Sequence, residues 1–181
     1  MKNQTISESQ QSILYGALLG DAYLYPKKGI IQLEQGSKNQ ASLFWLFEKL
    51  KNLTTGKTPR LVTRIDKRTG TQTQSYRFYT RALFHEWRQQ FFKENGVKKL
   101  PENFENCLNA TSLAVWFLND GGRSSGVKSG VFLTVDNYTQ TEMESIQHTL
   151  HCVFGIHARL HLSEKSRSGP IQKRLSITGA N

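Results

Sequence analysis

The sequence contains the same helix ending twice. LYGALLGDA (Leu14–Ala22) and LAVWFLNDG (Leu113–Gly121) are apolar segments that each stop at an aspartate, Asp21 and Asp120. The last carbonyl groups of a helix carry partial negative charge, so a carboxylate at that end is repelled unless something compensates it. The repeat therefore predicts two related units, each with an acidic helix end that needs a partner.

The segments that follow each ending appear in the same order, which favours a duplicated unit. Hydrophobic periodicity predicts an extended segment or strand, a helix and a strand pair after each ending, at 29–36, 39–53, 60–66 and 74–80, and again at 130–136, 139–154, 158–164 and 171–178. A further helix is expected over 82–95, with Gly96 as its C-terminal stop. The order predicts an α+β fold of two pseudo-symmetric αββαββ(α) halves, residues 1–106 and 107–181, with the final helix missing from the second half.

The charge balance favours a polyanionic partner. The chain has 24 Lys and Arg against 14 Asp and Glu, a net charge of +10 and a pI of about 9.8. A basic surface binds nucleic acid by releasing condensed counterions. No apolar run approaches the roughly 20 residues that cross a bilayer, and we expect neither an export signal nor a membrane partner. The two cysteines lack the spacing of metal ligands.

The repeated helix ends predict a metal centre. Gly16 and Gly20 lie four residues apart and would let the first helix approach the second closely. Asp21 and Asp120 would then emerge together, and their charges would repel unless divalent cations lay between them. Oxygen atoms at the two helix ends, including those of Gly20 and Asn119, suit Mg²⁺. Such ions activate water and stabilise the leaving oxygen in attack on a phosphate.

The two repeated segments resemble the paired motifs of the LAGLIDADG homing endonucleases, in the single-chain branch encoded by group I introns. LEQGSKN (33–39) and WRQQFFKENGVKKLP (87–101) also fit, and the resemblance extends over residues 12–178. Two positions depart from the pattern: Ala22 replaces the usual glycine, and Asn119 stands where a second acid is frequent. The resemblance implies motif helices packed at a central interface and antiparallel sheets that form a DNA-binding saddle.

The resemblance also implies an activity. A protein of this kind is a monomeric, site-specific endonuclease for double-stranded DNA, with Mg²⁺ or Mn²⁺ as cofactor. It would cut across the minor groove and leave 3′ overhangs at a long intron-insertion site. An organelle genome, in a chloroplast or mitochondrion, or a bacterial cytoplasm would fit such a product.

Family members place a lysine near each metal ion, and Lys98 matches that position before the second motif. Lys99 is the alternative if the register slips by one residue, and both are expected catalytic residues. The second half has no equivalent segment, so Arg123 or Lys173 is expected to substitute. Two polar residues at corresponding strand ends are expected to organise water: Gln35 and Asp136.

Alternation along the strands separates a core face from an open face that could read DNA. Leu61, Thr63 and Ile65 are expected on the core face. Arg pairs with guanine, Gln with adenine, and Asp or Glu with cytosine in the major groove. The expected DNA contacts are Gln32, Glu34, Arg60, Arg64, Asp66, Arg68, Gln72, Gln74, Arg77, Thr134, Arg159, His161, Lys165, Gln172 and Arg174, of which Arg68 and Lys165 are in loops suited to phosphate contacts.

Two other functions remain open on the same scaffold. An RNA-binding group I intron maturase would need the basic surface but neither aspartate, and intron RNA would be its partner. A DNA-binding relative that has lost catalysis is the third reading. The presence of both Asp21 and Asp120 favours the nuclease.

Overall fold

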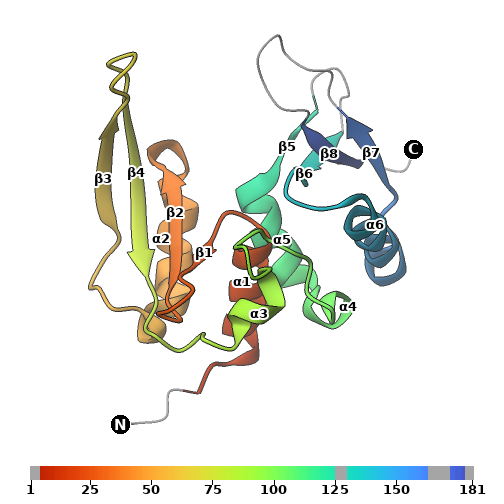
Figure 1. Ribbon diagram of the computed structural model, residues 1–181, viewed down its shortest axis with the longest axis horizontal. Coiled ribbons are helices and arrows are strands. Elements are labelled where there is room, and N and C mark those ends of the chain that lie inside the picture. Colours follow the sequence, from red (N-terminus) through yellow and green to blue (C-terminus); the bar gives the residue numbers. More distant parts are fainter. Residues whose placement is uncertain (1–4, 125–129, 163–171, 178–181) are drawn as a thin grey trace.

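The computed structural model describes residues 5–124, 130–162 and 172–177 and shows two α+β halves around a central helix pair. Helix α1 (Glu8–Leu19) of the first half lies beside helix α5 (Ala110–Asp120) of the second. Figure 1 shows one sheet on each side of this pair, each with its own helix. The predicted fold class is therefore confirmed.

The first half builds a four-stranded antiparallel sheet in the order β1-β2-β4-β3. Its strands and the helical segments between and after them are β1 (Tyr23–Leu24), β2 (Ile31–Gly36), the 3₁₀ turn η1 (Ser37–Asn39), α2 (Gln40–Leu50), the 3₁₀ turn η2 (Lys51–Leu53), β3 (Arg60–Ile65), β4 (Gln72–Tyr79) and α3 (Trp87–Phe91).

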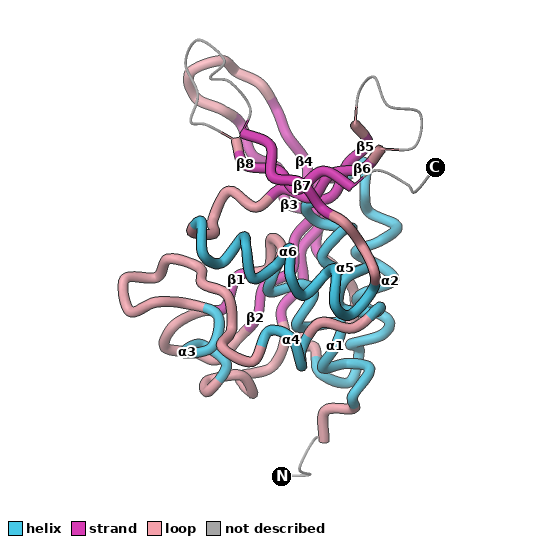
Figure 2. Tube along the Cα trace, turned by 90° about the vertical axis from the view of Figure 1, so that its right-hand side faces the viewer, coloured by secondary structure: helices cyan, strands magenta, loops and turns pink. Residues whose placement is uncertain are grey.

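The second half repeats this arrangement, with sheet order β5-β6-β8-β7. Its elements besides α5 are β5 (Gly121–Arg123), β6 (Val131–Thr134), α6 (Gln140–Phe154), β7 (Ala158–Leu162) and β8 (Lys173–Ile177). A four-residue helix, α4 (Phe104–Cys107), joins the halves, and the expected boundary at residue 106 falls inside it. In Figure 2 the C-terminal sheet and the end of the β3–β4 hairpin lie above the helices, so both halves direct strands to one side of the molecule.

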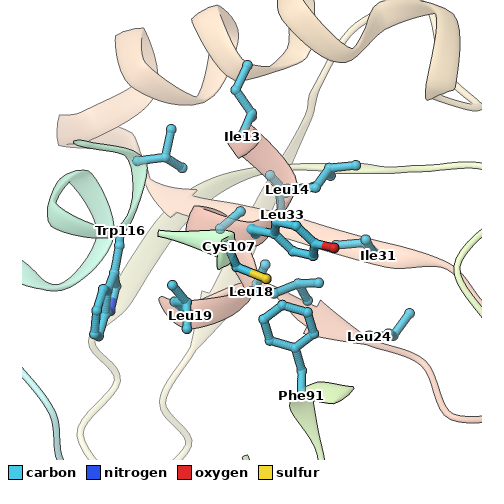
Figure 3. Close-up of a cluster of buried hydrophobic side chains, with 14 of the residues drawn as sticks. Ile13, Leu14, Leu18, Leu19, Leu24, Ile31, Leu33, Phe91, Cys107 and Trp116 are labelled. Atoms are coloured by element: carbon cyan, nitrogen blue, oxygen red, sulfur yellow. The ribbon is translucent and has the colours of Figure 1, made fainter. Parts of the chain in front are cut away.

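Helix α1 is the centre of the core. All seven residues from Ile13 to Leu19 are buried, as expected of a helix that is covered on every side. Figure 3 shows α1 side chains among Leu33 of the N-terminal sheet, Phe91 of α3 and Trp116 of α5. Burial of α1 fixes the place where its acidic end emerges.

The prediction of a helix over 82–95 is wrong, because only Trp87–Phe91 is helical in this segment. Phe92 adopts an extended conformation and forms a β-bridge with Lys98, and Gly96 makes the intervening turn with φ +83°. Phe84 and Phe92 are buried on either side of the short helix. Burial of these aromatic side chains overrides the local helical preference.

The prediction that Leu61, Thr63 and Ile65 of β3 face the core is also wrong. Leu61 and Ile65 are 51% and 64% exposed. β3 is the edge strand of its sheet, and Figure 1 shows the β3–β4 hairpin extending beyond α2. No helix in the described part of the chain is long and apolar enough to cross a membrane.

Candidate active site

Two glycines let the central helices approach closely. A Cβ atom at Gly16 would overlap the carbonyl oxygen of Ser112 and lie 2.9 Å from Val115 Cβ. A Cβ atom at Gly20 would lie 2.7 Å from Asn119 Cβ. These separations are too short for any residue except glycine, so the predicted close approach is confirmed.

The opposite ends of the two helices are tied together by their N-caps. Ser7 and Gln10 form a capping box on α1, and Asn109 and Ser112 form one on α5. Asn109 Nδ2 also donates to Ser12 Oγ at 2.7 Å, which links the α5 cap to α1. This contact fixes the longitudinal register of the helices, and so their acidic ends emerge side by side.

The two carboxyl groups interact directly. Burial and, after it, the negative charge of Asp21 raise the pKa of Asp120, which comes to about 7. Lys98 and a hydrogen bond from Trp116 lower the same pKa without reversing the shift. Asp120 thus lies in a place where its own charge is costly without a further cation.

Lys98 is the basic residue that reaches this pair. Its Nζ donates to the carbonyl oxygen of Gly20, the residue that ends α1. Burial lowers the pKa of Lys98, while the charges of Asp120 and Asp21 oppose that change. Lys99 instead lines a surface hollow with Gln89, Gln90, Glu102 and Asn103, so its expected catalytic place is wrong.

The side chain of Asn119 is held by hydrogen bonds to residues other than the two aspartates. Its Oδ1 accepts a hydrogen bond of 2.7 Å from Gln35 Nε2, and its Nδ2 donates to Val115 O at 3.1 Å. Ser42 Oγ donates to Gln35 Oε1. Gln35 is buried and anchors α5 to β2 and α2. The Asn119 side chain is thus engaged in these bonds, and its backbone carbonyl is the oxygen left for the expected ligand role. The water-organising role of Gln35 stays a prediction.

The other residues expected to assist the second half lie elsewhere. Arg123 is exposed at the end of β5, opposite Val131. Lys173 Nζ donates to Tyr138 O at 2.9 Å, and its backbone N–H donates to Asp136 Oδ1. Asp136 and Lys173 therefore fix the start of β8, and the structure does not bring Arg123, Lys173 or Asp136 into contact with Asp120.

Two contacts at the site were missed by the sequence reasoning. Trp116 Nε1 donates to Asp120 Oδ2 at 3.2 Å, and Tyr138 Oη donates to Leu19 O at 2.9 Å. Trp116 lies one helical turn before Asp120, a spacing that could have indicated the first contact. Tyr138 is buried against Trp116 of the same half, and its hydroxyl group crosses to Leu19 of the other half. Nothing in the sequence pattern marks it.

The donor set fits a hard cation. Asp21 and Asp120 supply carboxylate oxygens, and the carbonyl group of Gly20 lies beside them. The described residues contain no group of three His, Cys, Asp or Glu side chains that could hold a metal ion. Further ligands would have to be carbonyl, water or phosphate oxygens, and Mg²⁺ retains such ligands readily.

The open face of the N-terminal sheet carries a network centred on Glu34. Arg64 Nη1 lies 2.6 Å from Glu34 Oε1, and Arg77 Nη2 lies 2.5 Å from Oε2. Ser75 Oγ and Gln32 Nε2 also donate to this carboxylate. Burial opposes ionisation, but the hydrogen bonds from Arg64, Ser75 and Arg77 and the charge of Arg77 lower the pKa of Glu34 to about 2.

The strand register revises the predicted DNA-reading face. Arg60 lies opposite Arg77, which lies opposite Glu34, so these three side chains share a row. Gln72 and Gln74 lie opposite Ile65 and Thr63 on the other face, because side chains alternate along a strand. Grouping the two glutamines with Arg77 was therefore wrong.

Asp66 shapes the turn of the β3–β4 hairpin. Its Oδ1 accepts hydrogen bonds from the backbone N–H groups of Arg68, at 2.8 Å, and Thr69, at 3.4 Å. These bonds lower the pKa of Asp66. A carboxylate used in this way closes an Asx turn. The expected contact of Asp66 with a base stays a prediction. Arg68 is exposed in the same turn, as expected for a phosphate contact.

In the C-terminal sheet, Thr134, Arg174 and His161 lie in one row across β6, β8 and β7. The guanidinium group of Arg174 lies 4.4 Å from the ring centre of Phe132 and donates to Gln172 Oε1 at 2.7 Å. Two other residues expected to contact DNA, Arg159 and Lys165, are not part of this row. Arg159 is exposed on β7, opposite Ser176, and Lys165 lies outside the described residues.

Fold and site together define a pseudo-symmetric α+β protein whose halves share one acidic centre between two sheets. A sequence model of the LAGLIDADG DNA endonuclease family matches residues 11–181, and the chain belongs to this family. The expected resemblance is thereby confirmed over nearly the whole chain.

Individual relatives include maturases and endonucleases. The chain is 29% identical over 168 residues to the cytochrome b mRNA maturase bI2 of Debaryomyces hansenii, covering 88% of this chain and 62% of the maturase. It aligns with the homing endonuclease I-WcaI bound to its DNA recognition sequence with a TM-score of 0.81, at 21% identity, over 97% of this chain and 77% of that one. I-DmoI with nicked target DNA and manganese aligns with a TM-score of 0.50, at 15% identity, over 94% and 88% of the chains. These structures support the fold.

Proposed function

We propose that this protein is a site-specific endonuclease that hydrolyses both strands of a long DNA target at an intron-insertion site and leaves 3′ overhangs. The observation that carries the proposal is the meeting of Asp21 and Asp120, with Lys98, at the ends of the paired helices. Residues from both halves contribute to this one centre. A shared centre suits a duplex, which presents two scissile phosphates related by near-symmetry.

Asp21 and Asp120 would hold Mg²⁺, with Mn²⁺ as a substitute. Burial and the charge of Asp21 raise the pKa of Asp120, and a bound cation would offset both effects. Bound in this way, the ion would supply activated water and stabilisation of the leaving oxygen. The Trp116 N–H orients one oxygen of Asp120. The Lys98 ammonium, held on the Gly20 carbonyl, places positive charge where a phosphate would accumulate negative charge.

The proposed partner is double-stranded DNA, bound by a monomer. The net charge of +10 and the arginines on the open faces of both sheets support it. Arg60, Arg64 and Arg77 lie on the N-terminal sheet, and Arg159 and Arg174 lie on the C-terminal sheet. The neighbour I-WcaI is a homing endonuclease bound to its DNA recognition sequence.

A second function, assistance in splicing a group I intron RNA, is favoured by one observation: a relative at 29% identity is a cytochrome b mRNA maturase. That activity would use the basic surface without either aspartate. The chain spans 62% of the maturase's length, so residues outside the match could carry part of that activity. An organelle-encoded or bacterial intron product accommodates both functions.

Selection of cleavable sites from a randomised duplex library tests the proposal. We expect one long sequence family to be cut in Mg²⁺ or Mn²⁺, and to be bound without cutting in Ca²⁺. Cleaved ends should carry 3′ overhangs. Stimulation of intron splicing by a protein that cuts no duplex in any of these ions would replace the nuclease proposal with the maturase.

A further inference from the structure

The segment that joins the halves and carries Lys98 has two points of attachment. Within the N-terminal half, Phe92 bridges to Lys98, and the backbone N–H of Lys99 donates to Phe91 O at 2.9 Å. The N–H of Lys93 donates to Val97 O at 2.8 Å and closes the turn. These bonds hold the segment as far as Lys99 and leave the residues after Lys99 to be fixed by other contacts.

The second attachment comes from the C-terminal half. Glu142, in the first turn of α6, accepts a hydrogen bond of 2.9 Å from the backbone N–H of Leu100 through its Oε1. Its Oε2 accepts from Thr139 N at 2.7 Å and from Thr139 Oγ1 at 2.8 Å, which completes the α6 capping box. In a capping box the N3 side chain has to supply only one bond, the one to the N-cap N–H. The remaining oxygen of Glu142 is therefore free to hold the segment from the other half.

The surroundings favour a charged Glu142 in this place. Burial opposes ionisation, but hydrogen bonds from Thr139 and Leu100 and the positive charge of Lys93 lower the pKa of Glu142. Leu100 is half-buried and packs against the core. The carboxylate thus bonds to the joining segment at Leu100, two residues after Lys98.

We propose that Glu142 is a positioning residue that holds Lys98 against the acidic centre by anchoring the Leu100 N–H. Its importance for cleavage rests on the nuclease function proposed above. Lys98 lies two residues before Leu100, and its Nζ must reach the Gly20 carbonyl from a partly buried position. A carboxylate in the second half therefore sets the position of a lysine that serves the first half.

Three alanine variants separate this role from simple stabilisation of α6. Glu142→Ala removes both the cap contact and the Leu100 anchor. Thr139→Ala removes the side-chain cap at the same helix end but leaves Glu142 available to Leu100. Glu144→Ala removes an equal charge from the same helix, where Glu144 is exposed and bonded to Gln140.

Two measurements on the free protein do not depend on cleavage. Hydrogen exchange at the Leu100 amide and acetylation of the Lys98 amine, both followed by mass spectrometry, should each accelerate about tenfold in Glu142→Ala, the equivalent of one hydrogen bond to a charged group. Thr139→Ala and Glu144→Ala should stay within about twofold of the parent protein. Equal rates in Glu142→Ala and the two controls would overturn the proposal.

Single-turnover cleavage of a selected target then tests the consequence. Glu142→Ala should cut about tenfold more slowly with unchanged DNA affinity, since one anchoring bond is lost, while the controls cut at the parent rate. If the parent protein cuts no DNA, the proposed nuclease function is refuted. The exchange and acetylation results then still decide whether Glu142 anchors Leu100. An active parent with normal cutting by Glu142→Ala would refute the positioning role alone.

Discussion

The two halves end their central helices in the same way but give their aspartates different surroundings. Asp21 lies just beyond α1 and is exposed, whereas Asp120 is the last residue of α5, is half-buried and accepts a hydrogen bond from Trp116. The position in the first half that corresponds to Trp116 is Ala17, which has no donor to offer. Duplication has preserved the backbone, and the flanking side chains have made the two carboxylates unequal.

The two sheets also share a backbone arrangement but differ in the partners of their arginine side chains. In the N-terminal sheet, Glu34 holds Arg64 and Arg77 in ion pairs before any partner binds. In the described strands of the C-terminal sheet, Arg174 stacks on Phe132 and Arg159 is exposed on the neighbouring strand. One half thus presents arginines fixed by a carboxylate, while the other presents them on an aromatic ring or in solvent.

The largest expected effect tests whether the unequal aspartates serve one reaction. Asp21→Asn and Asp120→Asn should each reduce double-strand cleavage on the order of 1,000-fold or more, as for groups acting directly at a reacting centre, while target binding persists. Cleavage and gel-shift assays on the same duplex measure the two quantities. Undiminished cutting by either variant would show that this aspartate lies outside the active site.

The close helix approach predicts the next largest effect. Gly16→Ala should lower the free energy of unfolding by about 1–3 kcal/mol, because a methyl group would overlap the Ser112 carbonyl. Gly36→Ala is the matched control: nothing lies within 4 Å of its Cβ position, and we expect a change within about 0.5 kcal/mol. Urea unfolding measures both, and equal stabilities would contradict the packing.

The raised pKa of Asp120 predicts how pH and magnesium act on stability. The Asp120 carboxyl group has a pKa of about 7 in the folded state, whereas an unfolded aspartate has a pKa of about 4. Between these two pH values the folded state holds a proton that the unfolded state has lost. Stability contributed by this group is therefore present below about pH 4 and is lost as the pH rises to about 7. Mg²⁺ should raise Tm more at pH 8 than at pH 5, an effect that Asp120→Asn should remove. An equal rise in Tm at both pH values would show that Mg²⁺ does not bind to the Asp120 carboxylate.

The smallest expected effect concerns Glu34. Glu34→Gln removes the charge that holds Arg64 and Arg77, so binding to unrelated duplex should tighten a few-fold and discrimination for the target should fall. Arg64 is about half exposed, and its pairing with Glu34 is accordingly weak. Titrations against target and unrelated DNA at one salt concentration measure both changes. A loss of affinity for both duplexes would assign Glu34 a direct contact.

The sequence was sufficient for features that depend on local pattern. The acidic endings of α1 and α5, the glycine pair Gly16 and Gly20, and most strands follow from spacing within a segment. The place of Lys98 followed from the family resemblance. Features set by contacts between distant segments were missed or misassigned. Asn119 meets Gln35 only after β2 and α5 pack. Gln74 lies on the face opposite to the expected one, because a shift of one residue along a strand moves a side chain to the other face of the sheet.

The titration of the Asp120 carboxyl group, followed by NMR in the free protein, tests the central claim most directly. The account predicts a pKa near 7 in the parent protein, and a lower value in Asp21→Asn, where the neighbouring negative charge is gone. An Asp120 that titrates near 4 in both proteins would show that the two acidic helix ends do not meet, and would contradict the shared centre.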